Sequence, residues 1–286
     1  MSDKSEFILG VDIGGTHISA ALVNKSTWKI VSNNVVRNHV FSQESAKSIF
    51  LSWADTINNC IKATALPINY IGIAMPGPFD YENGISLISG QSKYDALYQM
   101  NVKTPLAVLI GIPEKNIHFI NDAAAFLQGE VFAQKLNTHE RVLGITLGTG
   151  LGSAVWNKGD KSFDANLWDT PYENSIFEEY LVTRWFIRRF KELTELEVSG
   201  LKQIINEHTN NPAFSIICKE YASHLVDFLC FFSEKYNCTN FIIGGNIAKA
   251  LPILLKDKQD QLNCFTIKTA TLGEEAAIIG AAAQFS

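Results

Sequence analysis

The chain lacks the features that mark several large classes of protein. Among its 286 residues no apolar run reaches the roughly 18 residues that a membrane-spanning helix requires, so we expect no membrane partner. The five cysteines include no C-x-x-C pair, which argues against a disulfide framework or zinc finger and favours reduced thiols. Basic residues are scattered and the formal net charge is −5, so nucleic acid is not an expected partner either.

Targeting and nucleotide-binding signals of the common kinds are also missing. The first residues, M-S-D-K-S-E, are polar and show no secretory signal, so with reduced cysteines they indicate a cytoplasmic protein. The sequence has no G-x-x-x-x-G-K-[ST] phosphate loop. Its G-T-G-L-G run at 148–152 does not fit G-x-G-x-x-G and leads into a strand, which disfavours a dinucleotide fold.

What the chain does contain is an alternation of strand and helix patterns, which predicts an α/β protein. Ser42 is expected to cap the first long helix, and the P-G-P-F-D-Y-E-N-G segment is expected to be an irregular loop. The main expected strands are 7–13, 17–23, 28–36, 70–75, 117–120, 141–147, 151–156, 240–243 and 265–268. The main expected helices are 46–61, 105–111, 123–134, 176–193, 212–236, 247–255 and 274–284.

An internal repeat indicates two related halves. Ile8–Leu22 aligns with Val142–Trp156, and both segments read as strand, glycine turn and strand. The separation is too long for a solenoid, so duplication of a domain explains the repeat better. The identical pairs are Leu9 and Leu143, Gly10 and Gly144, Gly14 and Gly148, Ser19 and Ser153, and Ala20 and Ala154.

Each repeat carries a glycine turn with a threonine, and two such turns suit phosphate. Backbone N–H groups in a tight turn can cradle an anion, and a threonine hydroxyl adds a further contact. The alternative for either turn alone is a plain β-hairpin. The candidate phosphate-binding residues are Gly14, Gly15, Thr16, Gly148, Thr149 and Gly150.

Four motifs in order resemble the sugar kinases of the ROK family, which belongs to the actin-like ATPase group with hexokinases and Hsp70. They are D-I-G-G-T (Asp12–Thr16), N-D-A (Asn121–Ala123), L-G-T-G-L-G (Leu147–Gly152) and I-I-G-G-N (Ile242–Asn246). The likeness extends to the closing E-A-A-I-I-G-A-A-A helix and so covers most of the chain. It implies two ribonuclease-H-like domains around a cleft, here expected as residues 1–121 plus 270–286 and residues 122–269.

The resemblance also implies a nucleotide and a metal. ATP would have its phosphates at the two glycine turns, and its adenosine would lie against Gly244, Gly245 and Asn246. Asp12 would position Mg²⁺ through a water molecule, since Mg²⁺ retains much of its hydration shell. The alternative for Asp12 is a carboxylate that only caps the turn.

The same family pattern assigns an acceptor site. Asp122 would be the general base for a sugar hydroxyl, with Asn121 fixing a neighbouring hydroxyl. Gly77, in the P-G-P segment, would bring its backbone to the sugar, and Glu178 would bind a sugar hydroxyl. The alternatives are that Asp122 is only the N-cap of the following helix and that Glu178 is a solvated helix acid.

The chain departs from the family in one segment. Many ROK proteins have an E-x-G-H segment and cysteines that bind zinc, but Val155–Tyr180 contains neither cysteine nor histidine, so we expect no zinc. The loss also removes a glutamate and a histidine that would contact the sugar. Asn166, Trp168 or Asp169 could substitute, the alternative being a surface loop with a half-buried tryptophan.

These features together predict an ATP-dependent kinase for a hexose hydroxyl, most readily the 6-hydroxyl of a glucose-like sugar. The alternatives are a kinase for an N-acyl amino sugar, a non-catalytic sugar or nucleotide sensor, and a phosphatase-like enzyme acting on polyphosphate. A ROK transcriptional repressor is disfavoured, because the first strand begins near Glu6 and leaves no room for a DNA-binding region. Family habit suggests a homodimer, although no sequence feature fixes one.

Overall fold

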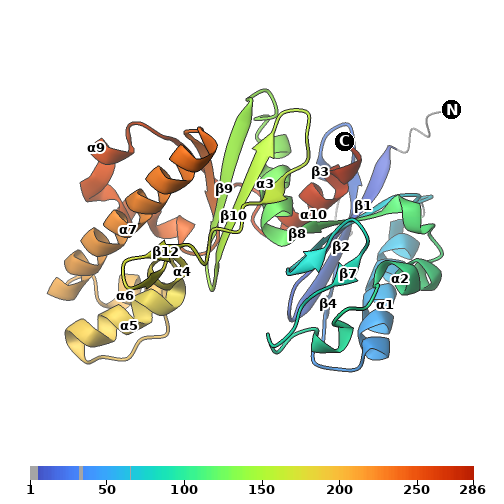
Figure 1. Ribbon diagram of the computed structural model, residues 1–286, viewed down its shortest axis with the longest axis horizontal. Helices are drawn as coiled ribbons and strands as arrows, with labels where there is room; N and C mark the ends of the chain where they lie inside the picture. The colour runs from blue at the N-terminus through green and yellow to red at the C-terminus, as the bar shows by residue number, and fades with distance from the viewer. Residues whose placement is uncertain (1–5, 32–34, 65) are drawn as a thin grey trace. The chain divides into compact units, whose positions relative to one another are not determined.

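The computed structural model describes residues 6–31, 35–64 and 66–286, and the chain forms two compact units (Figure 1). Unit 1 is Met1–Thr138, Gly159–Phe163 and Glu274–Ser286, and unit 2 is His139–Lys158 and Asp164–Gly273. This division differs from the expected boundaries at 121 and 270. Helix α3 (Asp122–Ala133) packs on α10 (Glu275–Ala282) and therefore belongs to unit 1.

Unit 1 is built on one twisted sheet with the order β3-β2-β1-β5-β8, and β4 also pairs with β2. The β1–β2 pair is an antiparallel hairpin, whereas β1, β5 and β8 run parallel. The strands are β1 (Phe7–Ile13), β2 (His17–Asn24), β3 (Lys29–Ile30), β4 (Val36–His39), β5 (Ile71–Met75) and β8 (Ile117–Asn121). A separate small pair is formed by β6 (Phe79–Asp80) and β7 (Ile85–Ser86).

The two faces of this sheet are covered in different ways. Successive residues of a strand point to opposite faces, and Leu9, Val11 and Ile13 enter a core with helices α1 (Ala46–Thr64) and α2 (Lys103–Ile110). On the other face α10 lies directly on the backbone. A Cβ on Gly72 would stand 1.8 Å from the carbonyl oxygen of Ala281, so only glycine permits this approach.

Unit 2 has a sheet of the same pattern, in the order β11-β10-β9-β14-β15. The strands are β9 (Arg141–Leu147), β10 (Leu151–Asn157), β11 (Phe163–Asp164), β14 (Asn240–Gly244) and β15 (Thr266–Thr269), with a separate pair β12 (Pro171–Tyr172) and β13 (Ser175–Ile176). The helices are α4 (Glu178–Leu181), α5 (Thr183–Thr194), α6 (Leu201–Glu207), α7 (Pro212–Tyr236), α8 (Leu251–Leu254) and α9 (Gln259–Leu262). A core rich in aromatic residues joins α5 and α7, as in the contact of Phe186 with Tyr221.

Each sheet thus contains an antiparallel hairpin, and two further strands extend the sheet parallel to the first strand of that hairpin. These are β5 and β8 beside β1, and β14 and β15 beside β9. The β1–β2 hairpin pairs Leu9 with Leu22, and the β9–β10 hairpin pairs Leu143 with Val155. This is the ribonuclease-H-like arrangement, and two copies of it make the actin-like ATPase fold that the sequence predicted. The repeated motifs therefore occupy equivalent hairpins.

Several local expectations were wrong. Ser45, not Ser42, lies at the start of α1, where its Oγ accepts a hydrogen bond from the Ser48 N–H. The P-G-P-F-D-Y-E-N-G segment contains strand β6, because its residues pair with β7. The expected helix 176–193 is broken at Val182, whose extended backbone (φ −110°, ψ 171°) separates α4 from α5. The third expected strand, 28–36, is two short strands around residues 32–34, which lie outside the described residues.

The long helix α7 is the clearest success of the pattern, since its bounds are those expected from the sequence. Asn211 caps it by accepting a hydrogen bond from the Ala213 N–H, and Pro212 occupies the first turn, where it costs no hydrogen bond. None of the helices in the described part of the chain is both long and apolar enough to cross a bilayer.

Candidate functional site

The acid residues of unit 1 gather at one edge of its sheet. Strands β1, β5 and β8 are parallel, so their carboxyl ends lie together, which is where open α/β sheets bind ligands. Asp12 lies near the end of β1, and Gly77 follows β5. Asn121 ends β8, and Asp122 begins α3. The structure therefore brings together the acid, base and acceptor residues that the sequence singled out in this half.

Asp12 is in an environment that opposes its ionisation. Partial burial, followed by the nearby Asp122 and Glu274 carboxylates, raises the pKa of Asp12 to about 7, while Arg37 acts in the opposite direction. Arg37 itself forms an ion pair with Glu274. An excess of negative charge at a partly desolvated position favours a bound cation.

The residues at this edge therefore fit Mg²⁺. The fit rests on Asp12, a carboxylate whose ionised form is disfavoured by burial and by the nearby carboxylates. Among residues 6–31, 35–64 and 66–286 there is no group of three or more His, Cys, Asp or Glu side chains that could hold a metal ion. Magnesium commonly binds through one or two carboxylates plus water and substrate phosphates, so a single carboxylate is an adequate protein anchor.

Asp122 is accessible to solvent at the start of α3, although protein surrounds its carboxylate closely. Desolvation raises its pKa above the ordinary value, while the Ala123 N–H and Lys93 act to lower it. A carboxylate with a raised pKa is a stronger base once it is deprotonated. Its accessibility leaves room for a hydroxyl to approach.

Capping of α3 is the task of Asn121. The side-chain oxygen of Asn121 accepts hydrogen bonds from the N–H groups of Ala123 (2.8 Å) and Ala124 (3.1 Å), so Asp122 is not the N-cap. The Nδ2 of Asn121 donates to the hydroxyl of Tyr81 at 3.2 Å, and that hydroxyl donates to the Met75 carbonyl. These contacts fix the start of α3 and leave the Asp122 carboxylate available.

A buried tyrosine forms a hydrogen bond with a carbonyl oxygen of the first glycine turn, Gly14–Thr16. The hydroxyl of Tyr94 donates to the Gly14 carbonyl oxygen at 2.5 Å. Neither Gly14 nor Gly15 has a positive φ, and a Cβ on either would make only ordinary contacts with the described atoms. The described part of the fold therefore does not itself require glycine at these two positions. The Lys93 side chain lies next to Gly15.

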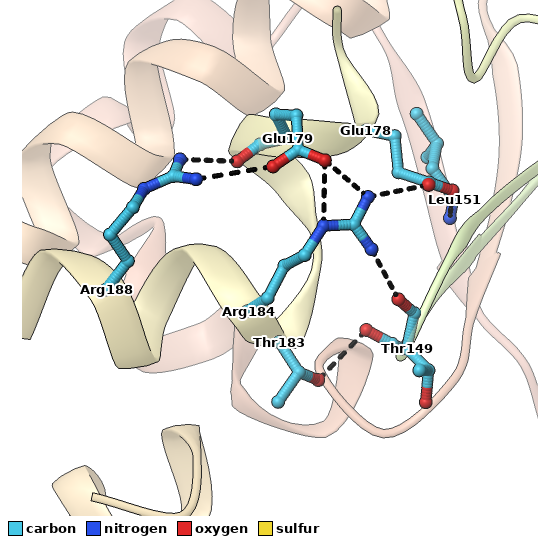
Figure 2. Close-up of polar contacts among 8 residues, drawn as sticks. Thr149, Leu151, Glu178, Glu179, Thr183, Arg184 and Arg188 are labelled. Carbon is cyan, nitrogen blue, oxygen red and sulfur yellow. Dashed lines mark hydrogen bonds and ion pairs between the residues drawn. The ribbon is translucent and has the colours of Figure 1, made fainter. Parts of the chain in front are cut away.

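In unit 2 the second turn, Gly148–Gly150, lies between β9 and β10, and α4 and α5 contact it. The Gly148 carbonyl oxygen accepts two hydrogen bonds from Thr183, both 2.9 Å, one from its N–H and one from its hydroxyl; Figure 2 draws the bond of the hydroxyl. No described atom would lie within 4 Å of a Cβ on Gly148, and its φ is not positive. This turn also leaves space beside its backbone.

Glu178 lies against this turn and not on a free helix face. Its Oε2 accepts a hydrogen bond from the Leu151 N–H at 2.9 Å, and its Oε1 pairs with Arg184 at 2.7 Å (Figure 2). Arg184 also donates to the carbonyl oxygen of Thr149 and to Glu179. The solvated-acid alternative for Glu178 is thereby wrong, because its side chain is mostly buried.

The third glycine motif, Gly244–Asn246, follows β14 in the same unit. Gly245 has φ 90°, and a Cβ there would stand 2.2 Å from the Leu147 carbonyl oxygen. The fold itself therefore requires Gly245, apart from any ligand. Asn246 is exposed, with Lys249 Nζ 3.4 Å from its side-chain oxygen.

Within the divergent segment, Trp168 lies next to Glu178. The Trp168 carbonyl oxygen accepts a hydrogen bond from the Glu178 N–H, and the indole N–H donates to the Asn166 side chain at 2.9 Å. Trp168 is 42% exposed, so this hydrogen bond holds an indole that is still partly accessible to solvent. A partly exposed aromatic ring beside a carboxylate is a common arrangement for binding sugars.

Sequence reasoning missed Tyr94 and Arg184. Tyr94 lies in an irregular segment with a positive φ, which no periodic pattern marks. Arg184 belongs to the helical run T-R-W-F-I-R-R-F, whose basic residues read as a solvated face. Only the approach of these segments to the glycine turns reveals their contacts.

Comparison with known proteins gives the family. The sequence model of the ROK family matches residues 8–162, more than half of the chain. Glucokinase of Thermotoga maritima is 31% identical over 155 residues, which cover 53% of this chain and 45% of that protein. An N-acetyl-D-glucosamine kinase of Mannheimia succiniciproducens is 26% identical over 151 residues, 52% of this chain and 45% of that protein. The matched part thus spans less than half the length of these two relatives.

The fold similarity extends over the whole chain. A ROK family glucokinase from Streptomyces griseus, solved in complex with glucose and AMPPNP, superimposes with a TM-score of 0.73 at 20% identity. The match covers 97% of this chain and 98% of that one. With the family motifs in order and the family fold in both units, this chain belongs to the ROK family.

Proposed function

We propose that this chain is an ATP-dependent sugar kinase that transfers the γ-phosphoryl group to a hexose hydroxyl, the 6-hydroxyl of a glucose-like sugar. The observation that carries the proposal is the Asp122 carboxylate. It is accessible, partly desolvated, and located at the same sheet edge as Asp12 and the first glycine turn. A positioned base beside a cation site and a phosphate-binding turn is the arrangement that phosphoryl transfer requires.

In this mechanism Asp122 accepts the proton of the attacking sugar hydroxyl, a contribution of typically about 10²–10⁴-fold. Asp12 holds Mg²⁺, which neutralises charge on the phosphates when bound. Lys93, beside Gly15 and within electrostatic reach of Asp122, adds positive charge near the first turn. Asn121 fixes the position of the base through its capping bonds.

The remaining contacts of the proposal bind the two substrates. Gly14, Gly15 and Thr16 of unit 1 and Gly148, Thr149 and Gly150 of unit 2 bind phosphate oxygens, and Gly244, Gly245 and Asn246 bind the adenosine. Gly77 and Glu178 contact the sugar. Trp168, whose partly exposed indole is hydrogen-bonded to Asn166, replaces part of the missing E-x-G-H segment. We further propose action in the cytoplasm and assembly as a homodimer.

The identity of the sugar has one serious rival. Relatives include both glucokinases and N-acetyl-D-glucosamine kinases, and the divergent segment at Asn166–Asp169 alters the part of the site that would distinguish them. An N-acyl amino sugar is therefore the second candidate acceptor. A non-catalytic sensor is disfavoured, because Asp12, Asp122 and both glycine turns are retained.

The decisive experiment is a coupled assay of ADP release with Mg²⁺ and ATP across a panel of hexoses, amino sugars and N-acyl amino sugars. We expect release that depends on one sugar and exceeds the rate without acceptor by at least about 10²-fold. Nucleotide binding with no release on any sugar would replace the kinase by the sensor. Release without any sugar would indicate a phosphohydrolase.

A further inference from the structure

The second glycine turn is fixed on its carbonyl side by the segment that joins α4 to α5. Thr183 holds the Gly148 carbonyl oxygen with two hydrogen bonds, and Arg184 Nη1 lies 3.3 Å from the Thr149 carbonyl oxygen (Figure 2). Two consecutive carbonyl groups of one turn thus point to two consecutive residues of α5. These contacts fix the orientation of two successive peptide groups of the turn relative to α5.

The orientation of the carbonyls determines that of the amides. In a trans peptide the C=O and N–H groups point in opposite directions. The Thr149 N–H shares a peptide with the Gly148 carbonyl, and the Gly150 N–H shares one with the Thr149 carbonyl. Both N–H groups must therefore point away from α5. Within the described ranges neither of them donates a hydrogen bond.

Glu178 narrows the set of available donors further. The N–H of Leu151, the next amide along, is occupied by the Glu178 carboxylate at 2.9 Å. The N–H of Gly148 is directed to the Gly150 carbonyl inside the hairpin. Two adjacent amides of the turn, at Thr149 and Gly150, are left for a ligand, and such a pair is suited to a phosphate oxygen.

The charges around Arg184 keep it in place. Glu178 and Glu179 both contact its guanidinium at 2.7 Å, and together they raise the pKa of Arg184, which stays fully charged. Arg188 completes the group through Glu179 and makes no contact with the turn (Figure 2). A guanidinium at the Thr149 carbonyl polarises that peptide and makes the Gly150 N–H a stronger donor.

We propose that Arg184, together with Thr183 and Glu178, is a positioning residue that presents the Thr149 and Gly150 amides to the phosphates of ATP. The inference rests on the proposed function and adds to it the device that orients the turn. It also gives Glu178 a second task. A carboxylate has about four acceptor positions, and two are used here, so a sugar hydroxyl can still bind.

The alternative is that Arg184 takes part in an exposed ion-pair group with no effect on ligands, as many surface pairs do. Arg188 makes the control possible. It lies one turn further along α5 and shares the partner Glu179, but it does not reach the turn. Arg184→Ala and Arg188→Ala therefore remove equal charges from the same helix, and they differ in the bonds to Thr149 and to Glu178, the two contacts that act on the turn.

The test measures binding of AMPPNP and of adenosine to the wild-type chain, Arg184→Ala, Arg184→Lys and Arg188→Ala by calorimetry. We expect Arg184→Ala to weaken the binding of AMPPNP about 10-fold, because the backbone N–H groups of Thr149 and Gly150 lose their fixed orientation. The binding of adenosine should be unchanged. Arg184→Lys, which keeps the charge but replaces the planar guanidinium by a single ammonium nitrogen, should be intermediate. Arg188→Ala should stay within about twofold of the wild type.

Three results would overturn the positioning role: AMPPNP binding to Arg184→Ala equal to the wild type, an equal loss with adenosine, or an equal loss in Arg188→Ala. Melting temperatures of the variants separate these results from unfolding. If the wild-type chain binds AMPPNP but phosphorylates no sugar, the proposed function fails while the positioning role stands. If it binds no AMPPNP, both fail.

Discussion

The residue two positions before the glycines is Asp12 in the first hairpin and Thr146 in the second. The two hairpins share their place in the sheet, and each is held on the carbonyl side of its turn. The first is held by the neutral hydroxyl of Tyr94 and the second by Thr183 and the cation of Arg184. The two hairpins therefore share a backbone arrangement while the side chains around them differ, and only the first has a carboxylate at this position.

The largest difference between the hairpins should appear when the first one loses its carboxylate and becomes neutral at this position, like the second. Asp12→Asn removes the carboxylate to which the proposal assigns Mg²⁺, and loss of a metal contribution of several kcal/mol should lower kcat by roughly 10²-fold or more. The measurement is the rate of ADP release against Mg²⁺ concentration. Thr146→Ser, the matched change in the second hairpin, should leave the Mg²⁺ dependence as in the wild type. A normal Mg²⁺ response in Asp12→Asn would remove the distinction between the hairpins.

Two glycine substitutions in unit 2 separate fold from ligand. Gly245→Ala places a Cβ 2.2 Å from a backbone oxygen at φ 90° and should lower the free energy of unfolding by about 1–3 kcal/mol or more. Gly148→Ala meets no described atom, so stability should hardly change while AMPPNP binding weakens. Urea unfolding and nucleotide titration on both variants check this. Equal destabilisation would mean that Gly148 is also required by the fold.

The ionisation of Asp12 gives a pH dependence that the second hairpin cannot show. Its pKa rises from 3.8 in the unfolded chain to about 7 in the fold, so ionisation costs stability as pH rises between these values. In EDTA at pH 8, the free energy of unfolding of Asp12→Asn should therefore exceed that of the wild type by about 1–3 kcal/mol. The full pKa shift would correspond to roughly 4 kcal/mol, which is the upper limit. The difference should shrink towards pH 5 and vanish near pH 4. A constant difference across pH would contradict the raised pKa.

The smallest expected effect tests the neutral support of the first turn. Tyr94→Phe removes the hydroxyl that donates to the Gly14 carbonyl, and loss of one neutral hydrogen bond costs about 1 kcal/mol of stability. AMPPNP binding should weaken only a fewfold, less than in Arg184→Ala, because no charge is lost. A larger loss of AMPPNP binding in Tyr94→Phe than in Arg184→Ala would mean that the Tyr94 hydroxyl matters more for nucleotide binding than the Arg184 guanidinium.

The site residues that lie at the ends of strands could be predicted from the sequence. Asp12, Asn121 and Asp122 could be found because each lies at the end of a short apolar run, and parallel strands bring such ends to one edge. Helix α7 could be bounded because Asn211 and Pro212 mark its start chemically. These signals are local, so one sequence suffices to read them.

What could not be predicted depends on contacts between distant segments. Glu178 was expected to contact a sugar, with a solvated helix acid as the alternative. Its contacts with the Leu151 N–H and with Arg184, which lies beyond the break at Val182, were not expected. Tyr94 reaches Gly14 from a segment without periodicity. The role of Asn121 as a cap was hidden because Asp122, its neighbour, is as good a capping residue by type.

The central claim is that Asp122 is the base of a sugar kinase, and single-turnover kinetics of Asp122→Asn test it most directly. The account predicts AMPPNP binding within about twofold of the wild type and phosphoryl transfer slower by about 10²–10⁴-fold. Asp55→Asn, a change of the same kind on the exposed face of α1, should transfer phosphate at the wild-type rate. Transfer by Asp122→Asn at a near-normal rate would contradict the assignment.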